Sequence, residues 1–201
     1  MVMSIAMPKR GGGSATEFRC LSRLKVDFLD PRPEQISVDD IVTGLCKAPR
    51  FCGQTPVTYT VAEHSLMVSR LVPPSLAMLA VFHDATEAYT GDIPKPLKVA
   101  MGAAFTRLEH KLHQAIAASL GISPDLPPEI KHADYVALAT EQRDLQGLPP
   151  EQYDVPAGIE PVNEIVTPIN STGCIERIFR RRIHDLQELM KWDRGMQAWA
   201  A

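Results

Sequence analysis

The chain has 201 residues, of which 45% are hydrophobic, so it can bury the core of one domain of ordinary size. Its formal net charge of −3 at pH 7 excludes the strongly basic surface of a typical duplex binder, so we expect no stable nucleic-acid complex. No apolar run is long enough to span a bilayer, and the four cysteines show no CxxC spacing. These features predict a cytoplasmic protein with reduced thiols and no membrane partner.

The N-terminal part of the chain predicts little regular structure. Residues 1–15 include the run KRGGG, and a Gly-rich polar segment cannot bury enough surface to order itself. We therefore expect a flexible lead, followed by a single domain over residues 16–201. Residues 18–29 alternate loosely between apolar and polar side chains, which favours one short strand.

Caps and periodicity predict two helices next. Ser37 is a candidate N-cap, and acidic residues fall in the turn after it, where carboxylates are favourable. A loop over residues 49–60 follows. From Val61 the apolar residues recur at helical spacing until a Pro-Pro pair ends the pattern.

The middle of the chain predicts the centre of the core. A helix from Ser75 to about Tyr89 is apolar on nearly every side before His83, so we expect it to be the central buried helix. The proline-punctuated segment 90–98 then predicts a loop.

Three further helices are predicted toward the C-terminus, over about 102–120, 128–145 and 172–192, the first of them stopped by Gly121. Residues 146–170 carry five prolines and predict a long surface loop. The last helix has an apolar stripe: Ile175, Ile178, Phe179, Ile183, Leu186, Leu189 and Met190. The expected fold class is an all-α bundle with a short β element near the N-terminus.

The adjacent pair His83-Asp84 is the most informative feature of the sequence. A lone histidine in an apolar helix is usually a hydrogen-bonded core residue, but a buried aspartate beside it needs a partner of its own. His64 precedes this pair and Asp134 follows it. Two imidazoles and two carboxylates suit one divalent ion such as Mn, Co, Fe or Zn, with positions left for water and substrate. An open site of this kind is more often catalytic than structural.

Four segments occur in an order that resembles the HD-domain metal-dependent phosphohydrolases, and in particular the bacterial and phage 5′-deoxynucleotidases. They are PRFCGQT, YTVAEHS, HDATEAYTGDIPKPLK and ADYVALATEQRDL, within about residues 39–144. The resemblance implies an all-helical HD-domain bundle. It also implies a divalent metal ion held by four side chains: His64, His83, Asp84 and Asp134.

The resemblance further implies roles near that ion. Glu87 would be the acid/base or water-orienting carboxylate, and Asp92 a second carboxylate near the attacking water or the leaving group. Arg50 would hold the substrate phosphate. Phe51 stands where the deoxynucleotidases have a tryptophan that helps to reject ribonucleotides, which puts sugar selectivity in doubt.

Lys95 and Lys98 flank Pro96, and we expect them near additional phosphates because the ammonium group is a compact phosphate partner. The alternative is that both are solvated surface lysines. The same choice is open for the basic run in the last helix.

We therefore expect a nucleotide phosphohydrolase that converts a deoxynucleoside monophosphate into a deoxynucleoside and phosphate. The alternatives are a deoxynucleoside triphosphate triphosphohydrolase, a guanosine tetraphosphate hydrolase and a non-catalytic nucleotide sensor that contains a metal. Family resemblance suggests a homodimer or higher oligomer, to which Trp192 and Trp199 would contribute.

Overall fold

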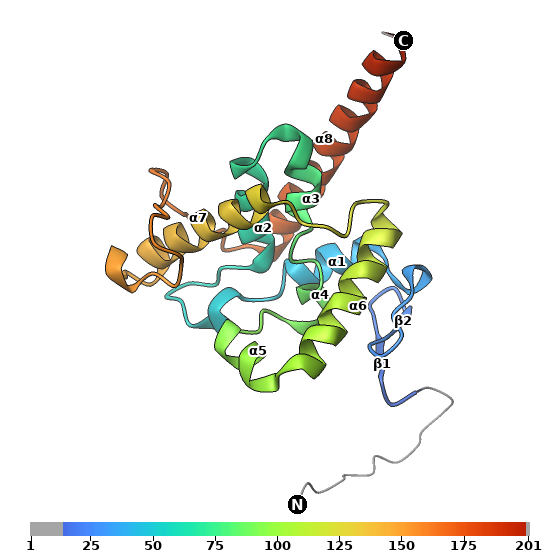
Figure 1. Ribbon diagram of the computed structural model, residues 1–201, viewed down its shortest axis with the longest axis horizontal. Coiled ribbons are helices and arrows are strands. Elements are labelled where there is room, and N and C mark those ends of the chain that lie inside the picture. The colour runs from blue at the N-terminus through green and yellow to red at the C-terminus, as the bar shows by residue number, and fades with distance from the viewer. Residues whose placement is uncertain (1–13, 200–201) are drawn as a thin grey trace, which may run out of the picture.

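A computed structural model describes the backbone of residues 14–199 and the side chains of residues 14–191. Most of the expected flexible lead and the side chains of Trp192 and Trp199 lie outside this part. Within it, the expected all-α class is confirmed, because eight α-helices form the body and the one small two-stranded sheet lies at its edge (Figure 1). None of the described helices has the length and apolar character to cross a membrane.

The helices follow one another with short connections, except after the first and after the seventh. Their bounds are α1 Val38–Leu45, α2 Val61–Leu71, α3 Ala77–Val81, α4 Glu87–Thr90, α5 Lys95–Met101, α6 Ala103–Leu120, α7 Pro128–Leu145 and α8 Thr172–Trp199. Four short 3₁₀ turns are also present in the described residues, the first of them before α1: η1 Pro33–Gln35, η2 Arg50–Gly53, η3 Pro74–Leu76 and η4 Pro150–Gln152.

The β element is a hairpin and not one strand. β1 (Glu17–Arg19) pairs antiparallel with β2 (Lys25–Asp27). The expectation of one strand over residues 18–29 was wrong, because the chain reverses its direction between β1 and β2. Arg23 has a φ of 74°, and its amide donates to the carbonyl of Cys20.

The predicted cap of the first helix is present, and the second helix has a cap that was not predicted. The Ser37 side chain accepts the amide of Asp39 at the start of α1. At the start of α2, Thr60 and Glu63 form a reciprocal capping box. α2 is the central helix, because eight of its eleven residues are buried and it contacts α1, α3, α7 and α8. The predicted helix over residues 75–89 therefore does not hold that place.

That predicted helix is broken in its middle. α3 ends at Val81, α4 begins at Glu87, and residues 82–86 form successive turns. The cause is local: the Nδ1 and the amide of His83 both donate to the carbonyl of Ala80, which in a regular helix would accept the amide of Asp84. The sequence predicted one continuous helix that carries His83, Asp84 and Glu87, and this prediction was wrong.

A close backbone approach fixes α4 against α1. A Cβ atom added to Gly44 in α1 would lie 2.6 Å from the carbonyl oxygen of Ala88 in α4. Only glycine allows this contact without a shift of one helix, so Gly44 sets where the short α4 and its Glu87 lie.

The segment after α4 is also more regular than expected. Residues 95–101 form α5, where the prolines had predicted a loop, and Gly102 with a φ of 71° separates α5 from α6. α6 ends as predicted at Gly121, which adopts the left-handed conformation.

The expected long loop over residues 146–170 is confirmed, apart from η4. It is tied to one turn of α7. Arg143 donates to the carbonyls of Val162 and Glu164, Asp144 accepts the amide of Val166, and Thr140 Oγ1 accepts the amide of Val162.

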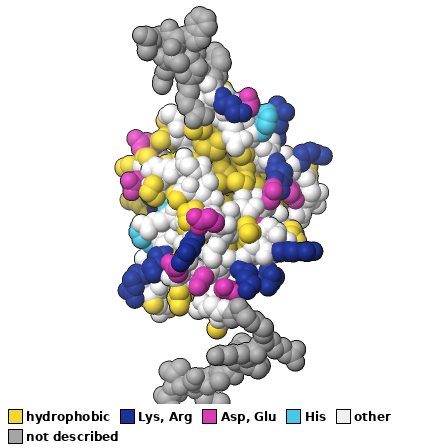
Figure 2. Space-filling view, turned by 90° about the vertical axis from the view of Figure 1, so that its right-hand side faces the viewer, with side chains coloured by type: hydrophobic (Ala, Val, Ile, Leu, Met, Phe, Trp, Pro, Cys, Tyr) yellow, Lys and Arg dark blue, Asp and Glu magenta, His cyan; other side chains and the backbone are white. Residues whose placement is uncertain are grey.

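α8 covers the core with its N-terminal half and then extends away from the body (Figure 1). Its buried contacts are Ile175, Phe179, Ile183 and Leu186. The predicted apolar stripe is wrong beyond this point, because Leu189 and Met190 are exposed. Figure 2 shows hydrophobic side chains gathered on one face just below the grey C-terminal residues.

Candidate metal centre

His64 is held in place by the elements on both sides of it. The capping box at Thr60 fixes the start of α2, and Glu63 also accepts the amide of Ile169. The His64 ring is fully buried, and its Nδ1 lies 2.6 Å from Oε1 of Glu141. Because the carboxylate accepts a hydrogen bond from Nδ1, the other nitrogen, Nε2, is the one left to bind an ion, and it points away from Glu141.

His83 presents its Nε2 in the same way. Its Nδ1 donates to the carbonyl of Ala80 over 2.8 Å, which leaves Nε2 as the acceptor of a neutral ring. The two imidazole centroids are 5.3 Å apart. The Nε2 atoms of two histidines from separate elements therefore face one small space.

Two carboxylates face that space as well. Asp84 Oδ2 lies 3.2 Å from His83 Nε2 and 3.6 Å from His64 Nε2. Asp134 Oδ1, from α7, lies 3.2 Å from His64 Nε2 and 4.0 Å from His83 Nε2. His64, His83 and Asp134 each offer a ligand atom within 4.8 Å of the others. The structure thus brings all four predicted ligands together.

The polar atoms of this group fit a divalent cation. Both Nε2 atoms are buried, and neither has a hydrogen-bond partner with acceptable geometry among the described residues. An unpartnered buried nitrogen is costly, and coordination of an ion removes that cost. The imidazoles are nearly inaccessible whereas Asp84 and Asp134 are partly exposed, so the open side of the group lies on the side of the carboxylates.

The charges agree with this interpretation. Burial and Arg50 lower the pKa of His64, but Glu141 and Asp134 outweigh them and raise it to about 10. Burial opposes ionisation of Asp84 and Asp134, but the two histidines lower the pKa of both carboxyl groups. The acids therefore require a positive charge beside them, which a proton on His64 supplies in the metal-free protein.

Glu141 is a residue of the site that the sequence analysis did not assign. It is fully buried, accepts from His64 through Oε1, and accepts from Arg50 through Oε2 over 3.1 Å. The signal was present in the sequence, because Glu141 lies seven residues after Asp134 and so on the same face of α7. A carboxylate that holds a ligating imidazole orients the ligand and raises its basicity.

The structure places Arg50 inside the site. Its side chain is buried against three acids: Glu141, Asp92 at 3.7 Å and Asp84 at 4.0 Å. Asp92 Oδ2 accepts the amide of Phe51, and the Phe51 ring lies 5.3 Å from the Arg50 guanidinium carbon. Asp92 therefore holds the turn that carries Arg50 and Phe51. Phe51 adopts the left-handed conformation, with φ of 54°.

Glu87 lies at the edge of the site with one oxygen unengaged. The residue is buried, and its Oε2 has no hydrogen-bond partner among the described residues. Burial, then Asp84 and Asp92, raise the pKa of Glu87 well above its usual value. Lys98 Nζ lies 3.7 Å from Glu87 Oε1 and 2.8 Å from Glu109, so Lys98 contacts acids of the protein. Lys95 is exposed on α5.

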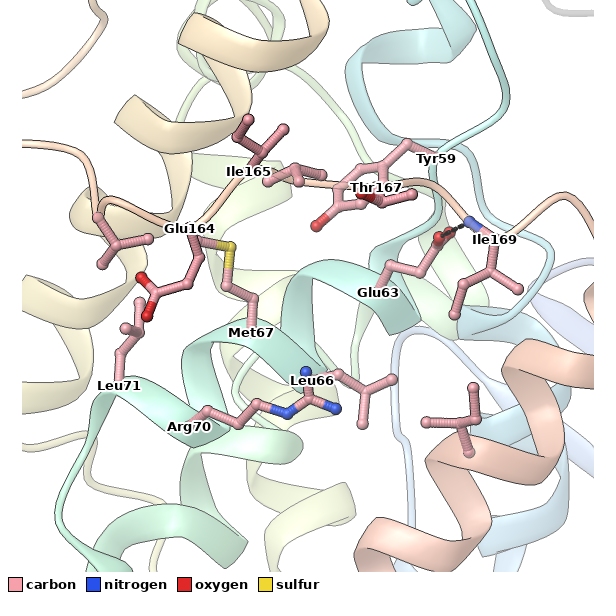
Figure 3. Close-up of a pocket in the computed structure, with 13 residues that line it drawn as sticks. Tyr59, Glu63, Leu66, Met67, Arg70, Leu71, Glu164, Ile165, Thr167 and Ile169 are labelled. Carbon is pink, nitrogen blue, oxygen red and sulfur yellow. Dashed lines mark hydrogen bonds between the residues drawn. The ribbon is translucent and has the colours of Figure 1, made fainter.

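The cavity in Figure 3 lies elsewhere, on the face of α2 that is turned to the long loop. It has a volume of about 390 Å³, and Leu66, Met67 and Arg70 of α2 face Ile165 and other residues of the loop. None of the predicted ligands lines it. Glu63 contributes to its wall and, through its hydrogen bond to the amide of Ile169, joins the loop to the turn that carries His64.

Comparison with known proteins gives the family but no activity. No family model matches the sequence. The chain is 38% identical over 160 residues to the uncharacterized protein YfdR of Escherichia coli K12, which covers 79% of this chain and 88% of that relative. The chain belongs to the YfdR family. A second member, the uncharacterized protein RCAP_rcc00048 of Rhodobacter capsulatus, is 35% identical over 149 residues, 68% of this chain and 76% of its own length.

Proposed function

We propose that this protein is an HD-domain phosphohydrolase that uses a divalent metal ion to cleave the 5′-phosphate ester of nucleotides, foremost deoxynucleoside monophosphates. One observation carries the proposal: the buried Nε2 atoms of His64 and His83, which have no hydrogen-bond partner in the described part of the chain, converge with the carboxylates of Asp84 and Asp134. Resemblance of four sequence segments to the HD-domain phosphohydrolases supports a nucleotide as the substrate.

The four ligands would hold one ion between α2, α7 and the turns at residues 82–86. Bound there, a divalent ion supplies the Lewis acidity that attack of water on a phosphate ester requires. Glu141 orients His64 through its Nδ1. Burial raises the pKa of Glu141, but His64 and then Arg50 outweigh it and lower that pKa. These buried partners keep the ligands in place before a substrate arrives.

Glu87 is the residue that the geometry favours for proton transfer. Burial, then Asp84 and Asp92, raise the pKa of Glu87 and so favour its protonated carboxyl form, and Oε2 has no hydrogen bond among the described residues. A carboxyl group in that state can deliver its proton to the leaving oxygen of a phosphate ester. Asp92 has a different task in this account, because its Oδ2 already holds the amide of Phe51.

A homodimer or higher oligomer is part of the proposal. The exposed Leu189 near the end of α8 and the hydrophobic area seen in Figure 2 support it, because such areas mark contact surfaces. Size-exclusion chromatography with light scattering tests it, and a monomer at micromolar concentration would rule it out.

A substrate screen tests the function. The purified protein is loaded in turn with Mn²⁺, Co²⁺, Fe²⁺ and Zn²⁺ and offered every common ribo- and deoxynucleotide as mono-, di- and triphosphate, together with guanosine tetraphosphate. We expect free phosphate and a nucleoside from deoxynucleoside monophosphates. Release of tripolyphosphate would instead support the triphosphohydrolase alternative. Nucleotide binding without any product would support the non-catalytic sensor.

Glu87→Gln tests the assignment of the proton donor. The amide keeps the size of the side chain but cannot give up a proton, so turnover should fall about 100-fold or more. Metal content should stay equal to that of the wild type, because Glu87 is not among the ligands. Loss of the metal together with activity would show that the assigned role is wrong.

A further inference from the structure

A phosphate ester needs a cation within reach, and the three basic residues predicted for this task differ in what they already contact. Arg50 is buried against Glu141, Asp92 and Asp84. Lys98 is engaged by Glu109 and Glu87. Moving either side chain to a substrate would leave a buried or partly buried acid without its partner, which is costly.

Lys95 has the opposite problem. It is exposed on α5, and within residues 14–191 no hydrogen bond or ion pair directs its ammonium group toward the metal centre. Nothing in the structure therefore ties it to the ligands.

Lys131 combines access with a tie to the ligands. It lies one turn before Asp134 on α7, so the two side chains share one face of the helix. Its Nζ donates to Asp134 Oδ2 over 2.7 Å, while Oδ1 of the same carboxylate faces His64 Nε2. The Lys131 side chain is 60% exposed, and its Nζ lies 4.6 Å from the centroid of the Tyr135 ring. It stands on the open side of the metal centre.

We infer that Lys131 binds the phosphate group of the substrate beside the ion held by Asp134. An ammonium group has three donors, and Asp134 takes one of them, so a phosphate oxygen can accept another. The ion pair with Asp134 is partly exposed and worth at most about 1 kcal/mol, so a small shift of Nζ toward a phosphate costs little. This inference rests on the proposed function and names the phosphate-binding side chain for it.

The rival explanation is that Lys131 only orients Asp134. The two roles give different results for Lys131→Met, whose side chain has similar length but no charge. If Lys131 binds phosphate, the variant should keep its metal affinity and lose affinity for phosphate. If it only orients Asp134, metal affinity should fall, while the phosphate affinity of the metal-saturated protein should stay equal to that of the wild type.

The test is calorimetric titration of Co²⁺ into the metal-free protein, and then of inorganic phosphate into the Co²⁺-loaded protein. We expect Lys131→Met to bind phosphate about tenfold more weakly or worse, and Lys131→Arg to stay within about threefold of the wild type. The metal affinity of both should remain within about twofold of the wild type. Lys191→Met is the matched control, because Lys191 pairs with Glu188 at the same kind of spacing on α8, beyond the last buried residue of that helix, Leu186.

The outcomes separate this inference from the proposed function. Equal phosphate affinity in the wild type and Lys131→Met overturns the inference and leaves the function untouched. Phosphate binding that depends on Lys131, in a wild type that hydrolyses no nucleotide, supports the phosphate site and overturns the function. A Co²⁺-loaded wild type that binds no phosphate overturns both.

Discussion

The two halves of the metal centre are built in different ways. His64 and Asp134 lie on α2 and α7, regular helices with long buried faces, and Glu141 links the two. His83 and Asp84 lie instead in the irregular turns at residues 82–86. The regular half is set by helical spacing, whereas the irregular half depends on one side-chain bond to the backbone and on the packing of α4 against α1.

The largest effect should come from removing the acid that joins the regular half. Glu141→Ala leaves the buried Arg50 without its partner, so the free energy of unfolding should fall by about 3–5 kcal/mol in a denaturant titration. Glu141→Gln is the control, because it keeps the shape of the side chain and one acceptor. It should be more stable than Glu141→Ala but bind metal about 10–100-fold more weakly than the wild type. Wild-type stability in Glu141→Ala would contradict the role of this acid.

The irregular half is best tested by a substitution outside the site, at Gly44 in α1. Alanine usually stabilises a helix relative to glycine, but in Gly44→Ala the new Cβ meets the backbone of Ala88. We expect a loss of about 1–3 kcal/mol in the free energy of unfolding, and lower turnover, because α4 carries Glu87. Gly173→Ala in α8 meets nothing within 4 Å and should be neutral or slightly stabilising. If both variants gained stability, the close approach of α1 and α4 would be wrong.

Metal affinity should depend on pH through His64. Its pKa is raised to about 10, so the ring holds a proton at neutral pH that an ion must displace. Apparent metal affinity should therefore rise about tenfold per pH unit between pH 6.5 and 8, measured in buffers that do not bind metal. Glu141→Gln should weaken this dependence, because Glu141 contributes to the raised pKa. A metal affinity independent of pH would contradict the displacement of a proton from His64.

The smallest effect is expected on the far side of α7. Arg143→Ala removes the donors to the carbonyls of Val162 and Glu164. Because these two hydrogen bonds are part-buried and exposed, the free energy of unfolding should fall by only about 1 kcal/mol. Limited proteolysis should cut residues 146–170 faster than in the wild type. Metal affinity should not change, and a large loss would mean that the loop and the metal centre are coupled.

The regular elements could be predicted because their signals are local. The Ser37 cap, the start of α2 at Val61 and the stop at Gly121 all depend on neighbouring residues in the chain. The break at residues 82–86 could not, because helical periodicity does not show that His83 Nδ1 competes for the carbonyl of Ala80. α5 was missed although prolines are common in the first turn of a helix, as Pro96 is here.

The identity of the site was more predictable than its internal contacts. The adjacent His-Asp pair and the resemblance of four segments to a known family selected the four candidate ligands, and the structure brings them together. Whether a basic side chain near them faces a substrate or an acid depends on tertiary packing. Arg50 and Lys98 therefore have partners that no spacing in the sequence indicates.

Titration of a divalent ion into the metal-free protein tests the central claim most directly. Co²⁺ is suitable because its absorption spectrum reports coordination by imidazole and carboxylate. We predict that one ion binds per chain in the wild type and that His83→Ala, with an unchanged circular dichroism spectrum, binds none. A wild type that binds no divalent ion, or a His83→Ala variant that binds it as tightly, would contradict the account.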